Sequence, residues 1–145
     1  MASDGFTALL RRGLALVALG LAACAPADGP QPIVYDRQPC ARCRMLISEP
    51  RFAAQLQSQA GEVQSFDDPG CLLLALDAKT AARALWFHHL REPRWIPGER
   101  VAFLRVPRSP MGSGLAAVEA GEPGALSLPE ARALLAVARR QEGMP

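Results

Sequence analysis

The residues with the clearest capacity for chemistry lie in one short segment, residues 40–45, whose sequence is CARCRM. It places two thiols, Cys40 and Cys43, three positions apart and adds the thioether of Met45 two positions later. Thiolate and thioether sulfur are the ligands that a soft ion such as Cu(I) prefers, whereas hard cations prefer oxygen. The pattern therefore favours a Cu(I) site at Cys40, Cys43 and Met45.

Zinc is the first alternative for these sulfur donors. A structural zinc site normally has four Cys or His ligands, often from two separated pairs. Cys71, His88 and His89 could complete such a set, but Met45 would then have no role. Because adjacent residues of a strand point to opposite faces, at most one of the two histidines could share a site with the cysteines.

The Cys-x-x-Cys spacing also suits redox chemistry. A thioredoxin-like pair, the basis of a periplasmic thiol–disulfide oxidoreductase, normally opens a helix that follows a buried strand. Here Cys40 follows a proline-rich segment instead. A simple disulfide between Cys40 and Cys43 is a further alternative in an oxidising compartment. Attachment of a c-type haem is excluded, because it needs a histidine where Arg44 stands.

The first 23 residues predict an export signal. A basic pair, Arg11 and Arg12, precedes an apolar run over residues 13–23, which at about 1.5 Å per residue is too short to cross a hydrocarbon core of roughly 30 Å. Such a run behind a positive segment is typical of a secretory signal peptide. It ends in the sequence LAAC, which resembles the lipobox of bacterial lipoproteins, so Cys24 is predicted to be lipidated.

The segment after Cys24 predicts a tether. Residues 24–39 contain four prolines, one glycine and few apolar side chains, a composition typical of an extended linker. Ala25 is not the aspartate that retains lipoproteins in the inner membrane, which favours an outer-membrane anchor facing the periplasm. The domain itself is then expected to occupy residues 40–142.

The elements that must position the sulfur donors follow from local patterns. Asp68-Pro69 is a typical helix start, with a side-chain acceptor at the N-cap and proline at the first helical position. Ser127 and Glu130 form a capping-box pattern before the final helix. Alternation and turn residues predict strands, so the expected order is strands over 51–58 and 63–66, a helix over 70–79, strands over 84–90, 101–106 and 115–119, and a helix over 127–140.

This order predicts an α+β fold, with two small strand-and-helix units forming one compact domain behind the lipidated flexible tether. The length of 145 residues and the 50% hydrophobic content are enough for one domain with a core. A net charge of +2 is far too small for typical nucleic-acid binding. No catalytic triad, phosphate loop or supported carboxylate pair is evident, so we do not expect an enzyme.

Several of these motifs together resemble the NosL family, the accessory lipoproteins of nitrous-oxide reductase. Apart from the lipobox, which ends at Cys24 in this chain, the family pattern has Cys-x-x-Cys-Gly-Met, a strand hairpin, Phe-Asp-Asp before a helix, and a late Pro-Met-Gly-x-Gly. The chain matches these elements in order across residues 40–117, with Phe66-Asp67-Asp68 before the helix and Pro110-Met111-Gly112-Ser113-Gly114 as the late turn.

The resemblance implies periplasmic Cu(I) binding and delivery of copper to nitrous-oxide reductase. Cys40, Cys43 and Met45 match the family's sulfur positions, and Met111 matches the methionine of the late turn. The thioether of Met111 is a further candidate donor, with an apolar, turn-anchoring role as the alternative. We interpret Cys71 mainly as a buried packing residue and as a possible additional donor.

One position departs from the family pattern within the loop. Arg44 stands where the family has glycine, so a backbone conformation with positive φ at this position would be strained. An adjacent arginine also favours the thiolate form of a cysteine, which is the form a metal needs.

Overall fold

The structure is a computed structural model that describes residues 29–76, 80–141 and 143. The predicted signal segment, residues 1–23, and the predicted lipidation site at Cys24 lie outside these residues. Within the described part of the chain, none of the helices combines the length and the apolar character that a membrane span requires.

The first unit is a four-stranded antiparallel sheet with one helix. In the described residues its strands lie in the order β2-β1-β3-β4. Strands β1 and β2 form a hairpin, in which Gly61 supplies the positive φ of +88° that the turn requires. The elements are η1 (Pro50–Phe52, a 3₁₀ turn), β1 (Ala54–Ser58), β2 (Val63–Phe66), α2 (Pro69–Ala75), β3 (Ala82–His88) and β4 (Trp95–Pro97).

The second unit is a three-stranded antiparallel sheet, in the order β6-β5-β7 within the described residues, followed by a helix. At the start of that helix the backbone N–H and the Oγ of Ser127 both donate to Glu130 Oε2, over 2.8 and 2.6 Å. The elements are η2 (Gly98–Arg100, a 3₁₀ turn), β5 (Val101–Arg105), β6 (Leu115–Glu119), β7 (Leu126–Ser127) and α3 (Leu128–Gln141).

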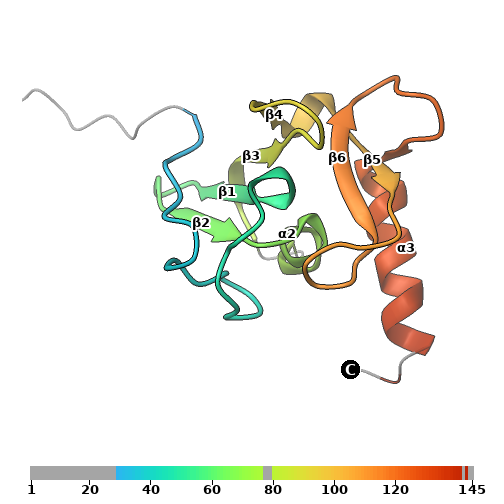
Figure 1. Ribbon diagram of the computed structural model, residues 1–145, viewed down its shortest axis with the longest axis horizontal. Coiled ribbons are helices and arrows are strands. Elements are labelled where there is room, and N and C mark those ends of the chain that lie inside the picture. The colour runs from blue at the N-terminus through green and yellow to red at the C-terminus, as the bar shows by residue number, and fades with distance from the viewer. Residues whose placement is uncertain (1–28, 77–79, 142, 144–145) are drawn as a thin grey trace, which may run out of the picture.

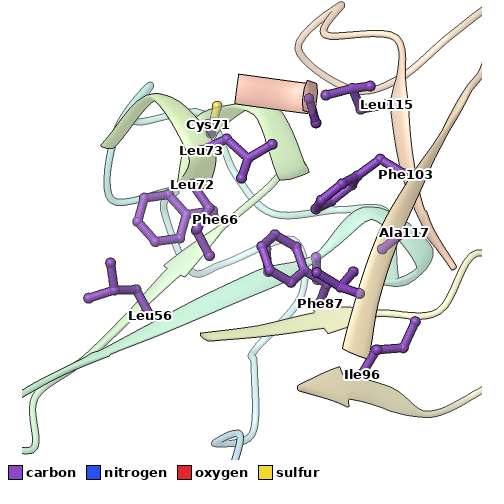
Figure 2. Packing of buried hydrophobic residues seen from close by; sticks show 14 of the residues in the cluster. Leu56, Phe66, Cys71, Leu72, Leu73, Phe87, Ile96, Phe103, Leu115 and Ala117 are labelled. Carbon is purple, nitrogen blue, oxygen red and sulfur yellow. The ribbon is translucent and has the colours of Figure 1, made fainter. Parts of the chain in front are cut away.

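One hydrophobic core joins the two units. Figure 1 shows the two sheets side by side, with α2 between them and α3 along the second sheet. Phe87 of β3 and Phe103 of β5 are both fully buried, and their rings meet edge to face with centroids 5.1 Å apart. Figure 2 shows this pair at the centre of the cluster and Cys71 at its margin, on α2.

The predicted α+β fold with two strand-and-helix units is confirmed. The structure adds two short strands that the sequence patterns did not predict, β4 and β7, each paired along one edge of a longer strand. Both are too short, at three and two residues, to show any periodicity. The helix predicted over 70–79 is described as far as Ala75, and residues 77–79 lie outside the described part.

The described part of the predicted tether, residues 29–39, contacts the domain. The backbone N–H of Gln31 donates to Gln55 Oε1 over 2.7 Å, and Gln55 Nε2 donates back to the Gln31 carbonyl over 2.9 Å. Ile33 and Tyr35 are half-buried against the core. The segment that leads into the cysteine loop therefore packs on β1.

Candidate metal centre

Residues 39–46 form a narrow loop that holds Cys40 and Cys43. The Cys40 N–H donates to the Met45 carbonyl over 2.8 Å, and the Arg44 N–H donates to the Cys40 carbonyl over 3.1 Å. The loop can close in this way because Arg44 takes a left-handed conformation, with φ of +68°. The positive φ considered from the sequence is thus present, and an arginine adopts it at a cost of roughly 1 kcal/mol.

The same loop is attached to the strand that leads into α2. The Ala41 N–H donates to the Ser65 carbonyl of β2 over 2.9 Å. Three residues after Ser65, Asp68 caps α2 by accepting the Gly70 N–H over 2.7 Å, and Pro69 takes the first helical position. The third residue of this helix is Cys71, so its thiol faces the loop that carries Cys40 and Cys43.

Three thiols therefore converge from two segments of the chain. The Sγ atoms of Cys40, Cys43 and Cys71 all lie within 4.8 Å of one another, and each is a free cysteine. Cys40 and Cys71 are buried, with exposed fractions of 0% and 5%, whereas Cys43 is half-buried. Three soft donors at this separation can bind a single metal ion, with Cys43 as the ligand nearest to solvent.

The three thiols differ in how readily they ionise. The hydrogen bond from the Cys71 thiol holds the pKa of Cys40 well below its ordinary value, against the effect of burial. The pKa of Cys71 is raised, first because its thiol donates that bond and then because of burial. Burial also raises the pKa of Cys43. Of the three thiols, Cys40 is therefore the one whose surroundings favour the thiolate form.

A second loop closes over the thiols from the other unit. The Met111 N–H donates to Asp68 Oδ2 over 3.0 Å, and the Ser113 hydroxyl donates to Asp68 Oδ1. Gly70 permits this approach, because a Cβ built at that position would lie 2.4 Å from the Cβ of Ser113. A single buried carboxylate thus caps α2 and fixes the Pro110–Gly114 turn beside Cys71.

A cavity of about 530 Å³ opens beside the thiols. Its wall combines the cysteine loop, α2, the late turn and α3, through residues Arg42, Cys43, Gly70, Cys71, Leu74, Met111, Gly112, Ser113, Leu135, Ala138 and Arg139. Met111 is 42% exposed and lines this cavity together with Cys43 and Cys71. An incoming ligand can therefore approach the thiols from this side.

Met45, the third sulfur residue of the cysteine loop, has a largely exposed side chain. Its carbonyl closes the loop, but its side chain is 58% exposed and it is not among the residues that line the cavity. Met45 immediately precedes Leu46, which pairs with Pro39 at the base of the loop, and its side chain lies on the surface. Met111, which is 66 residues away from Met45 in the sequence, lines the cavity together with Cys43 and Cys71.

The two histidines lie apart from the thiols. Among the described residues, the group of close metal-ligating side chains contains cysteines alone. His89 is buried, and its Nδ1 accepts the backbone N–H groups of Arg91 and Glu92, each over 3.1 Å. His88 packs edge to face on Trp95. Both therefore have structural partners, and a zinc set completed by histidine does not form in the described structure.

No protein-family model, curated protein or solved structure matches this chain. The geometry of the thiols therefore carries the functional argument.

Cys71 is the member of the cluster that sequence reasoning underrated. Its burial agrees with the packing role, and its sulfur also lies with those of Cys40 and Cys43. The available signal was its position in the first turn of a helix whose start at Asp68-Pro69 the sequence already predicted. What precedes it here is the cysteine loop, which the Ala41–Ser65 hydrogen bond places at the end of β2.

Proposed function

We propose that this protein binds Cu(I) and delivers it to a partner. The observation that carries the proposal is the convergence of Cys40, Cys43 and Cys71 within 4.8 Å beside an open cavity. Three thiolates form a trigonal shell suited to a soft monovalent ion. The Met111 thioether, on the same cavity wall, is a weaker fourth donor within this proposal.

The donor set favours Cu(I) over zinc. A structural zinc site is normally closed by four Cys or His ligands. Here the described residues bring together three cysteines, and both histidines have partners elsewhere. A thioether is also a poor ligand for zinc and a good one for Cu(I).

The open side of the cluster supports transfer rather than storage. Cys43 is half-buried and lines the cavity together with Cys71, so an incoming thiolate or imidazole could join the copper before one of the cysteines leaves. In this proposal the client is nitrous-oxide reductase, on the strength of the resemblance to the NosL family. The predicted lipidation of Cys24 would hold the protein to the outer membrane, facing the periplasm.

The thiol–disulfide oxidoreductase alternative is less well supported by the geometry. An attacking cysteine of that class is accessible and has a lowered pKa. Here these two properties are divided between residues: Cys40 has the lowered pKa but is fully buried, and Cys43 is accessible but has a raised pKa. The pair also sits in a closed loop rather than at the start of a helix.

Anaerobic titration with Cu(I) against a chromogenic chelator tests the proposal. We expect one copper per chain, and we expect Cys40→Ser, Cys43→Ser and Cys71→Ser each to weaken binding by at least about tenfold, the equivalent of 1.4 kcal/mol. Because Cys71 packs in the core, Cys71→Ala provides a second variant, and thermal unfolding of the metal-free forms controls for folding.

Two methionine variants discriminate between the sequence motif and the structural cluster. If the cavity wall supplies the thioether, Met111→Leu weakens Cu(I) binding and Met45→Leu leaves it unchanged. The reverse result would identify Met45, and not Met111, as the thioether ligand. Unchanged affinity in all three cysteine variants would overturn the proposed function.

A further inference from the structure

The cavity beside the thiols has the dimensions of a small-molecule site. Its volume of about 530 Å³ falls within the roughly 300–1,000 Å³ typical of ligand pockets. Its lining includes three sulfur-containing residues, Cys43, Cys71 and Met111, and three apolar residues, Leu74, Leu135 and Ala138. A ligand held here would place one end against a metal bound by the thiols.

The charged groups of this wall have one sign. Among the described residues that line the cavity, Arg42 and Arg139 are charged and none is acidic. Arg42 lies on the cysteine loop, immediately before Cys43, and Arg139 lies in the last turn of α3. The nearby carboxylate of Asp68 is buried and accepts hydrogen bonds from Gly70, Met111 and Ser113. A ligand with carboxylates would therefore meet guanidinium groups in the lining of the cavity.

From this arrangement we infer that the cavity binds a low-molecular-weight thiol that carries carboxylate groups, and that this thiol serves as the exchangeable ligand of the copper. The inference rests on the proposed function, because the thiol acts on the metal held by the three cysteines. Sulfur ligation requires the soft metal, and the carboxylates pair with Arg42 and Arg139.

The exchange step is a balanced ligand substitution. The incoming thiol loses its proton to solvent and forms a new bond from sulfur to Cu(I). The bond from copper to Cys43, the most exposed of the three cysteines, breaks, and the released Cys43 thiolate takes up a proton from solvent. Copper remains Cu(I) throughout, so neither an oxidant nor a reductant is needed.

The test measures the rate at which Cu(I) leaves the loaded protein for a chromogenic chelator in the presence of different thiols. Glutathione, which carries two carboxylates, is compared with cysteamine, a cationic thiol, at equal thiolate concentration. We expect glutathione to accelerate the transfer about tenfold more than cysteamine, the ratio that 1.4 kcal/mol of charge pairing corresponds to. The sulfur-free tripeptide γ-glutamyl-2-aminobutyryl-glycine, which keeps both carboxylates of glutathione but has no sulfur to bind the metal, should inhibit the effect of glutathione by occupying the cavity.

The arginines on the two sides of Cys43 provide a matched pair of variants. Arg42→Gln should abolish the preference for glutathione, and Arg139→Gln should reduce it. Arg44→Gln should leave the preference intact, because Arg44 does not line the cavity. The inference is wrong if the two thiols act alike, or if Arg44→Gln has the same effect as Arg42→Gln, which would indicate a general field of positive charge.

Two further outcomes distinguish a failure of this inference from a failure of the proposed function on which it rests. If the protein binds Cu(I) tightly but responds only to an acidic peptide with a cysteine, a protein partner occupies the cavity and the small-thiol inference is overturned. If the protein fails to retain Cu(I) before any thiol is added, the proposed function itself fails.

Discussion

The carboxylate of Asp68 accepts the backbone N–H of Met111 over 3.0 Å, across 43 positions of sequence. Asp68 also caps the helix that carries Cys71, so one side chain positions two sulfur-bearing residues that come from different units of the fold. The thiol cluster and the turn beside it are therefore mechanically connected. A change at Asp68 should act on the fold and on the metal centre together.

Asp68→Asn tests this connection. The asparagine oxygen can still accept from Gly70, but its amide group would face the Met111 N–H, and two donors would then meet in a buried place. We expect the free energy of unfolding to fall by about 1–3 kcal/mol, the cost of a buried donor without an acceptor, and urea denaturation measures it. Cu(I) affinity should fall as much as it does in Met111→Leu.

The neighbouring carboxylate provides the control for that substitution. Asp67 is equally buried but accepts a single long bond, 3.3 Å, from the Ser48 N–H. Burial raises the pKa of Asp67, so a neutral asparagine suits its site better. Asp67→Asn should therefore destabilise the protein less than Asp68→Asn. Equal losses would argue that burial of a carboxylate, and not the bond to Met111, explains the effect.

Gly70→Ala tests the close approach of the two loops. The added Cβ would lie 2.4 Å from the Cβ of Ser113, so the turn must move away from α2. We expect a loss of about 1–3 kcal/mol in unfolding free energy, typical of overpacking. In a Ser113→Gly background the same change should cost less, because the clashing atom is gone. A strictly additive double variant would contradict the contact.

Arg44→Gly should stabilise the protein. Arg44 has φ of +68°, which glycine adopts without strain, although glycine also loses more chain entropy on folding. The balance predicts a gain of about 0.5–1 kcal/mol in unfolding free energy. Arg42→Gly, two positions earlier and outside the positive-φ residues, should instead lose about 0.5–1 kcal/mol. Chemical denaturation of the two variants side by side measures the difference.

Local patterns were sufficient to predict the elements that carry the site. Asp68-Pro69 started α2 and the Ser127–Glu130 box started α3 as expected, because capping depends on residues a few positions apart. The two-unit α+β order followed from these starts. Strands β4 and β7 were missed because their pairing with β3 and β5 is a tertiary interaction with no local signal.

The composition of the metal centre was only partly predictable. Cys40 and Cys43 are neighbours in sequence and remain neighbours in space. Cys71 joins them through the packing of α2 against the loop, and the backbone of Met111 is held nearby by its bond to Asp68. Both are long-range contacts, so no fixed spacing in the sequence indicates them. Met45 was predicted as a ligand because it lies two residues after Cys43. Its backbone carbonyl closes the loop, and its side chain lies on the surface.

The ion pairs of Arg94 predict how stability depends on acidity. Arg94 Nη1 lies 2.6 Å from Glu119 Oε1, and Arg94 Nε lies 2.7 Å from Glu92 Oε2. Hydrogen bonds from Arg94 hold the pKa of both carboxyl groups below the ordinary 4.5. A lowered pKa in the folded state means that these pairs stabilise the fold above about pH 4.5 and that this contribution disappears as the carboxylates are protonated at lower pH.

Arg94→Gln should therefore make the free energy of unfolding less dependent on pH below about 4.5. The variant loses the ion-pair contribution at neutral pH, and its unfolding free energy should decline less than that of the unaltered protein as the pH falls through the range below 4.5. Arg105→Gln, at the exposed end of β5, should leave the slope unchanged. Urea unfolding at several pH values measures both profiles. The bond between Arg94 and Glu119 links the edges of the two sheets. If the curves for Arg94→Gln and the unaltered protein are parallel, the ion pairs of Arg94 make no pH-dependent contribution to stability.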